Sequence, residues 1–212
     1  MQSTLKFLGL DYTEEIFGRD PVTFLAPPQL KKIHPSGKSP VIRDGDLVVA
    51  ESGLIVEYLI EKYGQASELA AKSPEESLHI RYGIMSCEAN MMIAGMQLFI
   101  DKIVKQKSPE SDLAEITRVL DLVENAYAKN ELYLCLDNLQ QTIRSNSGYY
   151  SNGHLSGADF MYKNNIMLVT ENELVPDFTS KYSDLLKYLH LVDKRVEEAN
   201  HGKVTVIDHR KK

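Results

Sequence analysis

The sequence of 212 residues has no tryptophan and only two cysteines, Cys87 and Cys135. The two cysteines lie far apart and in no CxxC or metal-ligand spacing, so we interpret each as a structural thiol of a reducing compartment. Positive charge is also scarce, since 24 lysine and arginine residues oppose 30 aspartate and glutamate residues and the net charge is −6. We therefore expect no nucleic-acid partner, because phosphate backbones are bound by basic surfaces.

Long apolar runs are missing as well. The longest, residues 91–100, contains Gln97 and is too short to span a bilayer, which predicts no transmembrane segment but leaves peripheral membrane association open. The first residues show no basic region followed by an apolar stretch, so we expect no secretory signal and a cytoplasmic location. The six histidines form no pattern such as HExxH, so we predict no metal site.

The first third of the chain alternates short elements, and the rest follows a helical period. Asp44-Gly45 between two apolar runs predicts a hairpin, and Gly64 is expected to end the helix after it. The predicted elements of residues 1–64 are a helix end at 4–10, strands at 12–17, 40–43 and 47–50, and helices at 28–33 and 51–63. Residues 65–74 are predicted as a linker. Helices are predicted at 75–106, 110–144, 156–171 and 182–200 of a helical domain spanning 75–202, and residues 203–212 as a loose tail.

Ser39-Pro40 stands at the start of a predicted strand, where a proline without an N–H group is tolerated. If this bond is cis, the backbone N–H and C=O groups of Ser39 turn outward and are free to pair with an extended peptide. A plain turn is the alternative, because most X–Pro bonds are trans.

Glu51-Ser52 follows the second hairpin strand and opens a helix, whose first N–H groups attract anions. A hydroxyl and a carboxylate at this place suit a ligand that carries both a carboxylate and an ammonium group. Lys38 could pair with a second carboxylate of the same ligand. The alternatives are that Ser52 only caps the helix and that Glu51 and Lys38 are merely solvated.

Taken together, these features resemble a known binding signature. The run HPSGKSPVI, the Asp-Gly hairpin and the run AESGLIVEYL resemble the glutathione-binding motif of the glutathione transferases, and FLAPPQLKKIHP is similar to fungal members. The resemblance implies a thioredoxin-like glutathione-binding domain at 1–64, followed by the all-helical domain of that family. It also implies that the Ser39 backbone, beside Pro40, pairs with the cysteinyl unit of glutathione. Glu51 and Ser52 would hold the γ-glutamyl end, and Lys38 would lie near the glycine end or the backbone of glutathione. His34 replaces the family's usual asparagine, so no ligand role is carried onto it.

The second half of the chain carries a structural motif. Ser156 and Asp159 have the S-x-x-D spacing of a helix-capping pair, and the family has a similar pair that serves folding. Met85, Met91, Met92 and Met96 lie on one predicted helix and are interpreted as core or dimer packing, with an apolar substrate pocket as the alternative. The resemblance further implies a homodimer, a small hydrophobic electrophile as second substrate, and glutathione as co-substrate without any other cofactor.

The sequence departs from the family at its front. Family members begin with a central strand and a turn whose Ser, Tyr or Cys contacts the glutathione sulfur, whereas residues 5–12 here match the end of the helix that follows. Ser3, Thr4 and Tyr12 are poor substitutes by position, so we predict no catalytic residue. We expect this chain to be truncated, to bind glutathione weakly and to catalyse slowly, and Tyr12–Phe17 to lack a strand partner on its inner side.

The function expected from the resemblance is conjugation of the glutathione thiolate to electrophiles, with glutathione peroxidase or thiol-transfer activity as related reactions. The alternative is a noncatalytic binding or regulatory module of the same fold. A redox protein with a thioredoxin-like cysteine is disfavoured, because residues 1–64 contain no cysteine.

Overall fold

The computed structural model describes residues 1–20, 25–199 and 201–211. It divides into two compact units, one formed by Met1–Ala70 with Asp193–Lys212 and the other by Ala71–Val192. The division after Ala70 falls inside the predicted linker of residues 65–74. Three predicted segments extend beyond these residues. Residue 24 begins the run FLAPPQLKKIHP, residue 200 ends the helix predicted at 182–200, and residue 212 ends the predicted tail, and all three lie outside the described residues.

The first unit mixes short strands and helices. Its elements are α1 (Gln2–Phe7), β1 (Tyr12–Ile16), α2 (Leu30–Ile33), β2 (Val41–Asp44), β3 (Leu47–Ala50), α3 (Ser52–Tyr63) and β4 (Val204–Asp208), with a 3-10 turn at His209–Lys211. β2 and β3 pair in antiparallel fashion around the turn at Asp44 and Gly45. Gly45 has φ 60°, the left-handed conformation that this tight turn needs. The predicted hairpin is therefore present.

The core of this unit lies between the hairpin and two helices. Leu5 of α1, Val49 of β3, and Ile55 and Leu59 of α3 form one buried cluster. Helix α3 turns a single face to this cluster, since Ile55 and Leu59 are 0% and 2% exposed while Leu54 is 55% exposed. Burial of large aliphatic side chains contributes about 2 kcal/mol each, so this small cluster fixes α3 against the hairpin.

The prediction of a loose tail was wrong, because β4 is a regular strand. It runs parallel to β1, with Tyr12 opposite Val204 and Ile16 opposite Asp208. At the entry to β4, a Cβ atom on Gly202 would lie 2.3 Å from the backbone of Leu10, so only glycine fits at this point. At its far end the His209 ring contacts the Glu15 carboxylate at 3.0 Å. The C-terminal segment is therefore anchored along the whole length of β1.

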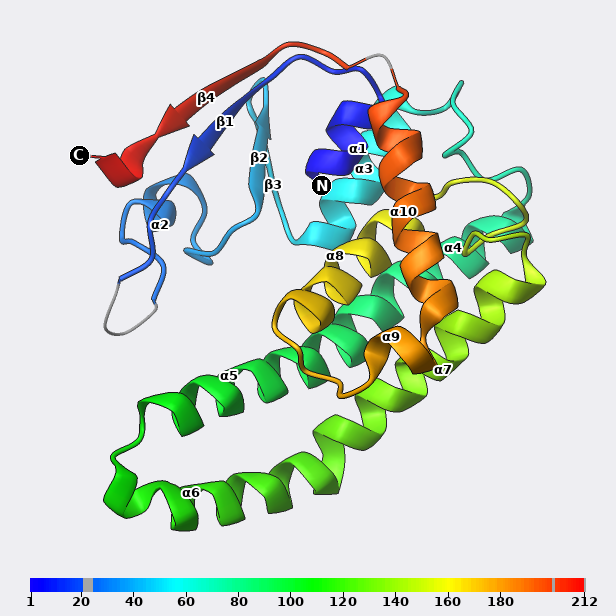
Figure 1. Ribbon diagram of the computed structural model, residues 1–212. Coiled ribbons are helices and arrows are strands. Elements are labelled where there is room, and N and C mark those ends of the chain that lie inside the picture. The colour runs from blue at the N-terminus through cyan, green and yellow to red at the C-terminus, as the bar shows by residue number, and fades with distance from the viewer. Residues whose placement is uncertain (21–24, 200, 212) are drawn as a thin grey trace. The chain divides into compact units, whose positions relative to one another are not determined.

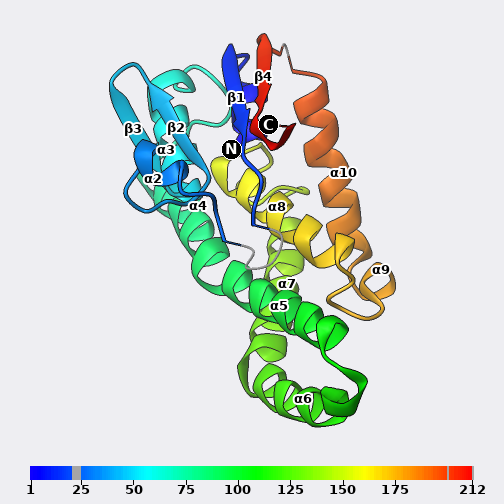
Figure 2. The ribbon, with the colours of Figure 1, turned by 90° about the vertical axis from the view of Figure 1, so that its left-hand side faces the viewer.

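The strands of this unit form two separate sheets within the described part of the chain, β1 with β4 and β2 with β3. Figures 1 and 2 both place β1 between β4 and β2, and Figure 1 shows α1 and α3 on one side of the hairpin and α2 on the other. A cleft of about 1120 Å³ lies along β1 and β2. β1 thus has a partner on one edge, and its other edge borders this cleft.

The second unit consists of helices. They are α4 (Pro74–Ser86), α5 (Ile93–Lys107), α6 (Glu110–Val123), α7 (Lys129–Ser145), α8 (Gly157–Glu171), α9 (Phe178–Lys181) and α10 (Ser183–Glu197), the last turn of which belongs to the first unit. The π-helical segments Cys87–Met92 and Glu124–Ala128 join α4 to α5 and α6 to α7. Two long helices over 74–107 and 110–145 result, with ends within a residue of those predicted. Ser73 caps the first of them by accepting the Glu76 N–H, and Pro74 follows in the first helical turn.

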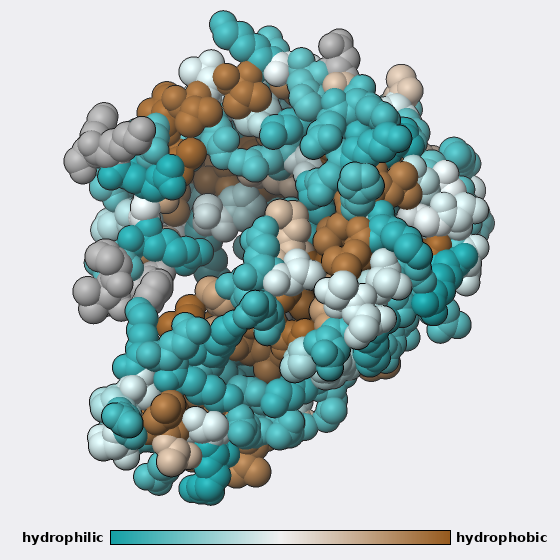
Figure 3. Space-filling view, viewed as in Figure 1, coloured by the Kyte–Doolittle hydropathy of each residue, from teal (hydrophilic) through white to brown (hydrophobic). Residues whose placement is uncertain are grey.

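The helical unit buries many large apolar side chains. They include Met91, Leu132, Leu136, Phe160, Ile166, Tyr182 and Leu185, each at most 2% exposed. Figure 3 shows a mainly polar surface over the viewed side of helices α5 and α6, with hydrophobic residues scattered among polar ones. The helix over 74–107 is long and apolar enough to cross a membrane, but the long core helices of folded domains meet the same criterion of length and composition.

Candidate functional site

The register of the hairpin brings the predicted site residues to one end. Val41 pairs with Ala50, so the residues before Val41 and those after Ala50 leave the hairpin at its open end. Ser39-Pro40 and Glu51-Ser52 therefore share this end, although they lie twelve positions apart in sequence. The Ser39–Pro40 bond is cis, and both residues line the cleft.

The loop before Ser39 is folded by local hydrogen bonds. The Gly37 N–H donates to the His34 carbonyl at 2.9 Å, and His34 Nδ1 lies 2.9 Å from Ser36 Oγ. The Lys38 N–H also donates weakly to Ser36 Oγ, at 3.4 Å. Lys38 and Ser39 are both exposed. His34, to which no ligand role was assigned, thus helps to shape the turn that presents these two residues.

Glu51 has an unusual backbone conformation. Its φ of 75° and ψ of 124° lie outside the regions that side-chain-bearing residues normally occupy. Such conformations cost on the order of 1–3 kcal/mol and occur mainly at functional sites. The Glu51 carbonyl accepts the Ile55 N–H at 2.9 Å, so the strained residue is also the first residue of the helical hydrogen-bond ladder.

The start of α3 has the properties of an anion-binding end. Ser52 is the first helical residue rather than the cap, and within the described residues no side chain makes a capping bond at Glu51. The N–H groups of the first turn lack partners inside the helix and carry a partial positive charge. Glu51, the residue just before this turn, is exposed. A carboxylate thus directly precedes the N–H groups of the first turn in the sequence, a combination of charges that suits an amino-acid head group.

A cluster at the other end of the hairpin fixes this arrangement. One oxygen of Asp44 accepts hydrogen bonds from Tyr58 Oη at 2.7 Å, Lys62 Nζ at 2.8 Å and Tyr63 Oη at 2.6 Å. These three donors hold the pKa of the Asp44 carboxyl well below its usual range. The hairpin turn is thereby tied to the last turns of α3. The Asp44-Gly45 turn was predicted from the sequence but the cluster was not, because its signal there is the spacing of Tyr58, Lys62 and Tyr63 alone.

The hydroxyl residues near the N-terminus are not placed for contact with a ligand sulfur. Ser3 and Thr4 are 9% and 0% exposed within α1. Tyr12 is half-buried against the cluster of Leu5, Val49, Ile55 and Leu59. Burial, with the neighbouring charge of Glu14, raises the pKa of its phenol. Tyr12 is thus a packing residue with a protonated hydroxyl group.

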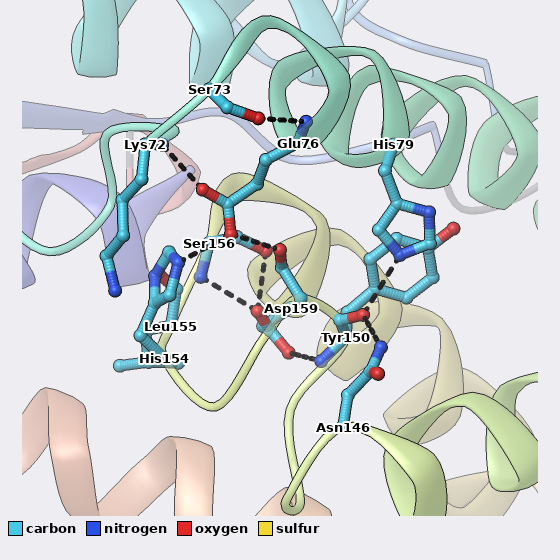
Figure 4. A network of polar contacts seen from close by, with 11 residues as sticks. Lys72, Ser73, Glu76, His79, Asn146, Tyr150, His154, Leu155, Ser156 and Asp159 are labelled. Carbon is cyan, nitrogen blue, oxygen red and sulfur yellow. Dashed lines mark hydrogen bonds and ion pairs between the residues drawn. The ribbon is translucent and has the colours of Figure 1, made fainter.

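Ser156 and Asp159 begin α8 as a capping box. Asp159 is fully buried and accepts the N–H groups of Tyr150 and Ser156, each at 2.8 Å (Figure 4). Its carboxylate also accepts the hydroxyl groups of Ser156 at 2.7 Å and Tyr188 at 2.9 Å. Burial raises the pKa of Asp159, and these donors oppose the effect. The pair therefore links α8 to the preceding loop and to α10.

A second buried network, which was not predicted from the sequence, lies beside it in Figure 4. Glu76 of α4 is 6% exposed and contacts Ser151 Oγ and His154 Nε2, each at 2.9 Å. His154 Nδ1 faces the Leu155 carbonyl at 2.9 Å. Burial alone would raise the pKa of Glu76, but hydrogen bonds from the Lys72 N–H, His154 and Ser151 outweigh it and lower the pKa to about 2.

This network predicts a pH dependence of stability. The pKa of Glu76 is lower in the folded than in the unfolded chain, so its contribution is complete above about pH 4.5 and is lost as the pH falls towards 2. The full shift corresponds to about 3 kcal/mol. In urea unfolding followed by circular dichroism, the stability difference between wild type and Glu76→Gln should shrink over this range. Equal pH profiles of the two proteins would contradict the prediction.

The two units define a class of protein in which a small αβ domain, with a β-hairpin followed by a helix, is combined with a helical domain. Residues 1–67 match the family "Glutathione S-transferase, N-terminal domain". The chain is 32% identical to glutathione S-transferase 1 of Saccharomyces cerevisiae over 164 residues, which are 74% of this chain and 70% of that protein. It is 24% identical to glutathione S-transferase 3 of Schizosaccharomyces pombe over 73% of this chain and 63% of that protein. The chain belongs to the glutathione S-transferase family.

Solved structures agree on the fold. A glutathione S-transferase of Actinobacillus pleuropneumoniae is similar with a TM-score of 0.64 at 22% identity, over 94% of this chain and 86% of that one. A glutathione transferase homologue of Lodderomyces elongisporus, whose structure holds two GSH per subunit, has a TM-score of 0.66 at 18% identity, over 92% and 91% of the two chains. The thioredoxin-like plus helical architecture predicted from the sequence is confirmed.

Proposed function

We propose that the open end of the β2–β3 hairpin binds glutathione. The Ser39 backbone pairs with the cysteinyl unit of the tripeptide. The first turn of α3, with Ser52 and the Glu51 carboxylate, holds the carboxylate and the ammonium group of the γ-glutamyl end. Lys38 lies near the glycine carboxylate. The observation that carries this proposal is the strained backbone of Glu51 at the start of α3.

The reaction proposed is attack of the glutathione thiolate on a small hydrophobic electrophile, in which a C–S bond forms as a leaving group such as chloride departs. Peroxide reduction is the second proposed reaction, in which two glutathione thiols are oxidised to glutathione disulfide as the peroxide is reduced to an alcohol and water. The protein contributes by holding both reactants together. No metal or further cofactor takes part in this proposal. The proposed location is the cytoplasm, where glutathione is reduced and detoxification of electrophiles takes place.

A noncatalytic glutathione-binding module is the second candidate. It is favoured by the positions of Ser3, Thr4 and Tyr12, whose hydroxyl groups are buried or committed to packing. Binding would then persist without turnover.

Calorimetric titration with glutathione, paired with a conjugation assay on a chloronitrobenzene, tests both candidates. Ser52→Ala should weaken binding roughly 10- to 100-fold, because it removes a hydrogen bond to a charged group. Glu61→Gln, which alters an exposed carboxylate elsewhere on α3, serves as the control and should leave affinity unchanged. Binding with turnover supports the transferase, and binding without turnover supports the module. Absence of binding, or equal affinity of Ser52→Ala and wild type, contradicts the proposed site.

We also propose that the protein forms a homodimer through the long helix over 74–107. One side of this helix exposes a row of large apolar residues at helical spacing, the α4–α5 stripe, which consists of Leu78, Tyr82, Met85, Ile93, Met96, Ile100 and Val104. Met91, by contrast, is 1% exposed and belongs to the core. An exposed apolar row of this length is typical of a surface that a partner covers.

Sedimentation velocity should therefore give a mass of twice 24.0 kDa for the wild type. Leu78→Glu combined with Tyr82→Glu should yield the monomer, because two charges would be buried without partners in the interface. Leu113→Glu, at an exposed apolar residue of α6 outside the stripe, is the matched control and should remain dimeric. A monomeric wild type would rule out the dimer.

A further inference from the structure

The turn at residues 151–154 contains the one Asn-Gly step of the sequence, Asn152–Gly153. Both of these residues are exposed, whereas Ser151 and His154 on either side are 0% and 5% exposed. Ser151 and His154 also form an antiparallel bridge, so the chain enters and leaves the turn side by side. Water therefore reaches the two middle residues of a turn whose ends are buried.

An Asn-Gly step is chemically reactive. Asparagine is a thermolabile residue, because the backbone nitrogen of the next residue can attack its side-chain amide carbon. Glycine has no Cβ atom to obstruct this attack. A C–N bond forms as the bond to the side-chain nitrogen breaks and ammonia leaves, which gives a five-membered succinimide ring. Water then opens the ring to aspartate or to isoaspartate, in which the main chain runs through the former side chain.

The folded turn holds the nitrogen atom that would react. The Gly153 N–H donates to the Ser151 carbonyl at 2.6 Å, and this nitrogen has to lose its proton before it attacks. Gly153 has φ 78°, a conformation that the turn imposes and that glycine adopts without strain. Attack on the Asn152 side chain therefore requires the turn to open, which breaks this hydrogen bond and frees the backbone to rotate.

Glu76 of α4 opposes this opening. Its Oε1 atom contacts Ser151 Oγ and His154 Nε2, each at 2.9 Å, and Figure 4 shows the contact with His154. Both ends of the turn are thus tied to one buried carboxylate, and hydrogen bonds to a charged acceptor are stronger than neutral ones. Local opening becomes rarer as the contacts that close a segment become stronger. The Glu76 carboxylate therefore limits how often the Gly153 nitrogen is released.

We propose that Asn152 is a site of spontaneous conversion to isoaspartate, and that the contacts of Glu76 restrain this modification in the folded protein. Isoaspartate lengthens the main chain between Ser151 and His154 and adds a negative charge to the turn. The two flanking residues then no longer have the spacing at which both contact one oxygen of Glu76. Conversion therefore loosens the loop before α8 permanently.

The test is incubation of the folded protein at mildly alkaline pH, followed by digestion with trypsin and mass spectrometry. Trypsin releases residues 145–163 as one peptide, which contains Asn152 and also Asn146 as an internal comparison. Conversion raises the peptide mass by a single dalton, and chromatography against synthetic standards distinguishes isoaspartate from aspartate. Asn152 should convert faster than Asn146, but roughly tenfold or more slowly than in the same protein unfolded in guanidinium chloride.

Three variants examine the restraint. Glu76→Gln should convert roughly tenfold faster than wild type, because the acceptor of both turn contacts loses its charge. Ser151→Ala removes one contact and keeps the His154 pair, so it should convert several-fold faster, and it decides the question if Glu76→Gln does not fold. Glu110→Gln removes an exposed carboxylate from the first turn of α6 and is the matched control, which should convert at the wild-type rate.

Several outcomes would overturn the proposal. Conversion of Asn152 no faster than that of Asn146 in the folded protein would mean that the turn is not a reactive site. Equal rates in folded and unfolded wild type, or in wild type and the folded network variants, would mean that Glu76 does not restrain the reaction. The isolated isoaspartate form should exchange amide hydrogens faster in residues 149–156 than the unmodified protein, and unchanged exchange would contradict the loosening.

Discussion

Asp159→Ala is expected to lower the free energy of unfolding by about 4 kcal/mol, measured by urea denaturation with circular dichroism. The substitution leaves two N–H groups and two hydroxyl groups without their acceptor in a place where Asp159 is 0% exposed. Each unsatisfied buried donor costs about 1–3 kcal/mol, less what repacking recovers. Circular dichroism is the suitable probe, because the chain has no tryptophan.

Asp112→Ala is the matched control for this prediction. Asp112 is also in the first turn of a helix, but it is exposed, and the only contact seen for its side chain among the described residues is with the Ser111 hydroxyl at 2.8 Å. Its replacement should cost less than about 0.5 kcal/mol. If both variants lost the same small amount, the network around Asp159 would not be a source of stability.

Glu51→Gly is expected to separate stability from binding. Glycine tolerates positive φ, so relief of the backbone at Glu51 should raise the free energy of unfolding by about 1 kcal/mol. The same change removes the carboxylate proposed to hold the ammonium group of glutathione, and affinity should fall roughly 10- to 100-fold. Thermal unfolding and calorimetric titration on the same protein measure the two effects.

Two further variants isolate these effects. Glu51→Gln keeps the strained backbone, so it should lose affinity without gaining stability. Glu173→Gly relieves another positive φ, of 49°, in the helical unit and should stabilise the protein without changing affinity. A Glu51→Gly protein that binds glutathione as tightly as wild type would remove Glu51 from the site.

The features that could be predicted from the sequence are those encoded over short distances. The Asp44-Gly45 turn and the flanking apolar runs specify the hairpin within a few residues, and the hairpin register then places Ser39 and Glu51 at one end. The period of apolar residues likewise located the long helices. Such signals depend on local conformation and on one buried face, which a single sequence displays directly.

The remaining features depend on contacts between distant parts of the chain. β4 was taken for a loose tail because its valines alternate with polar residues and its partner β1 lies 192 positions earlier in the chain. His154 and Glu76 are 78 positions apart, and neither carries a local signal of pairing. The conformation of Glu51 could not be predicted either, because a side-chain-bearing residue gives no sign of positive φ.

The position of β4 also affects the order in which the chain acquires structure during synthesis. The first unit combines β1, β2 and β3, from residues 12–50, with β4 at residues 204–208, whereas the second is one continuous segment, Ala71–Val192. On the ribosome the helical segment can fold as soon as it emerges, but β1 can pair with β4 only after residues 204–208 have been made. A nascent or prematurely terminated chain would therefore present β1 as an open edge, which chaperones or other chains could bind.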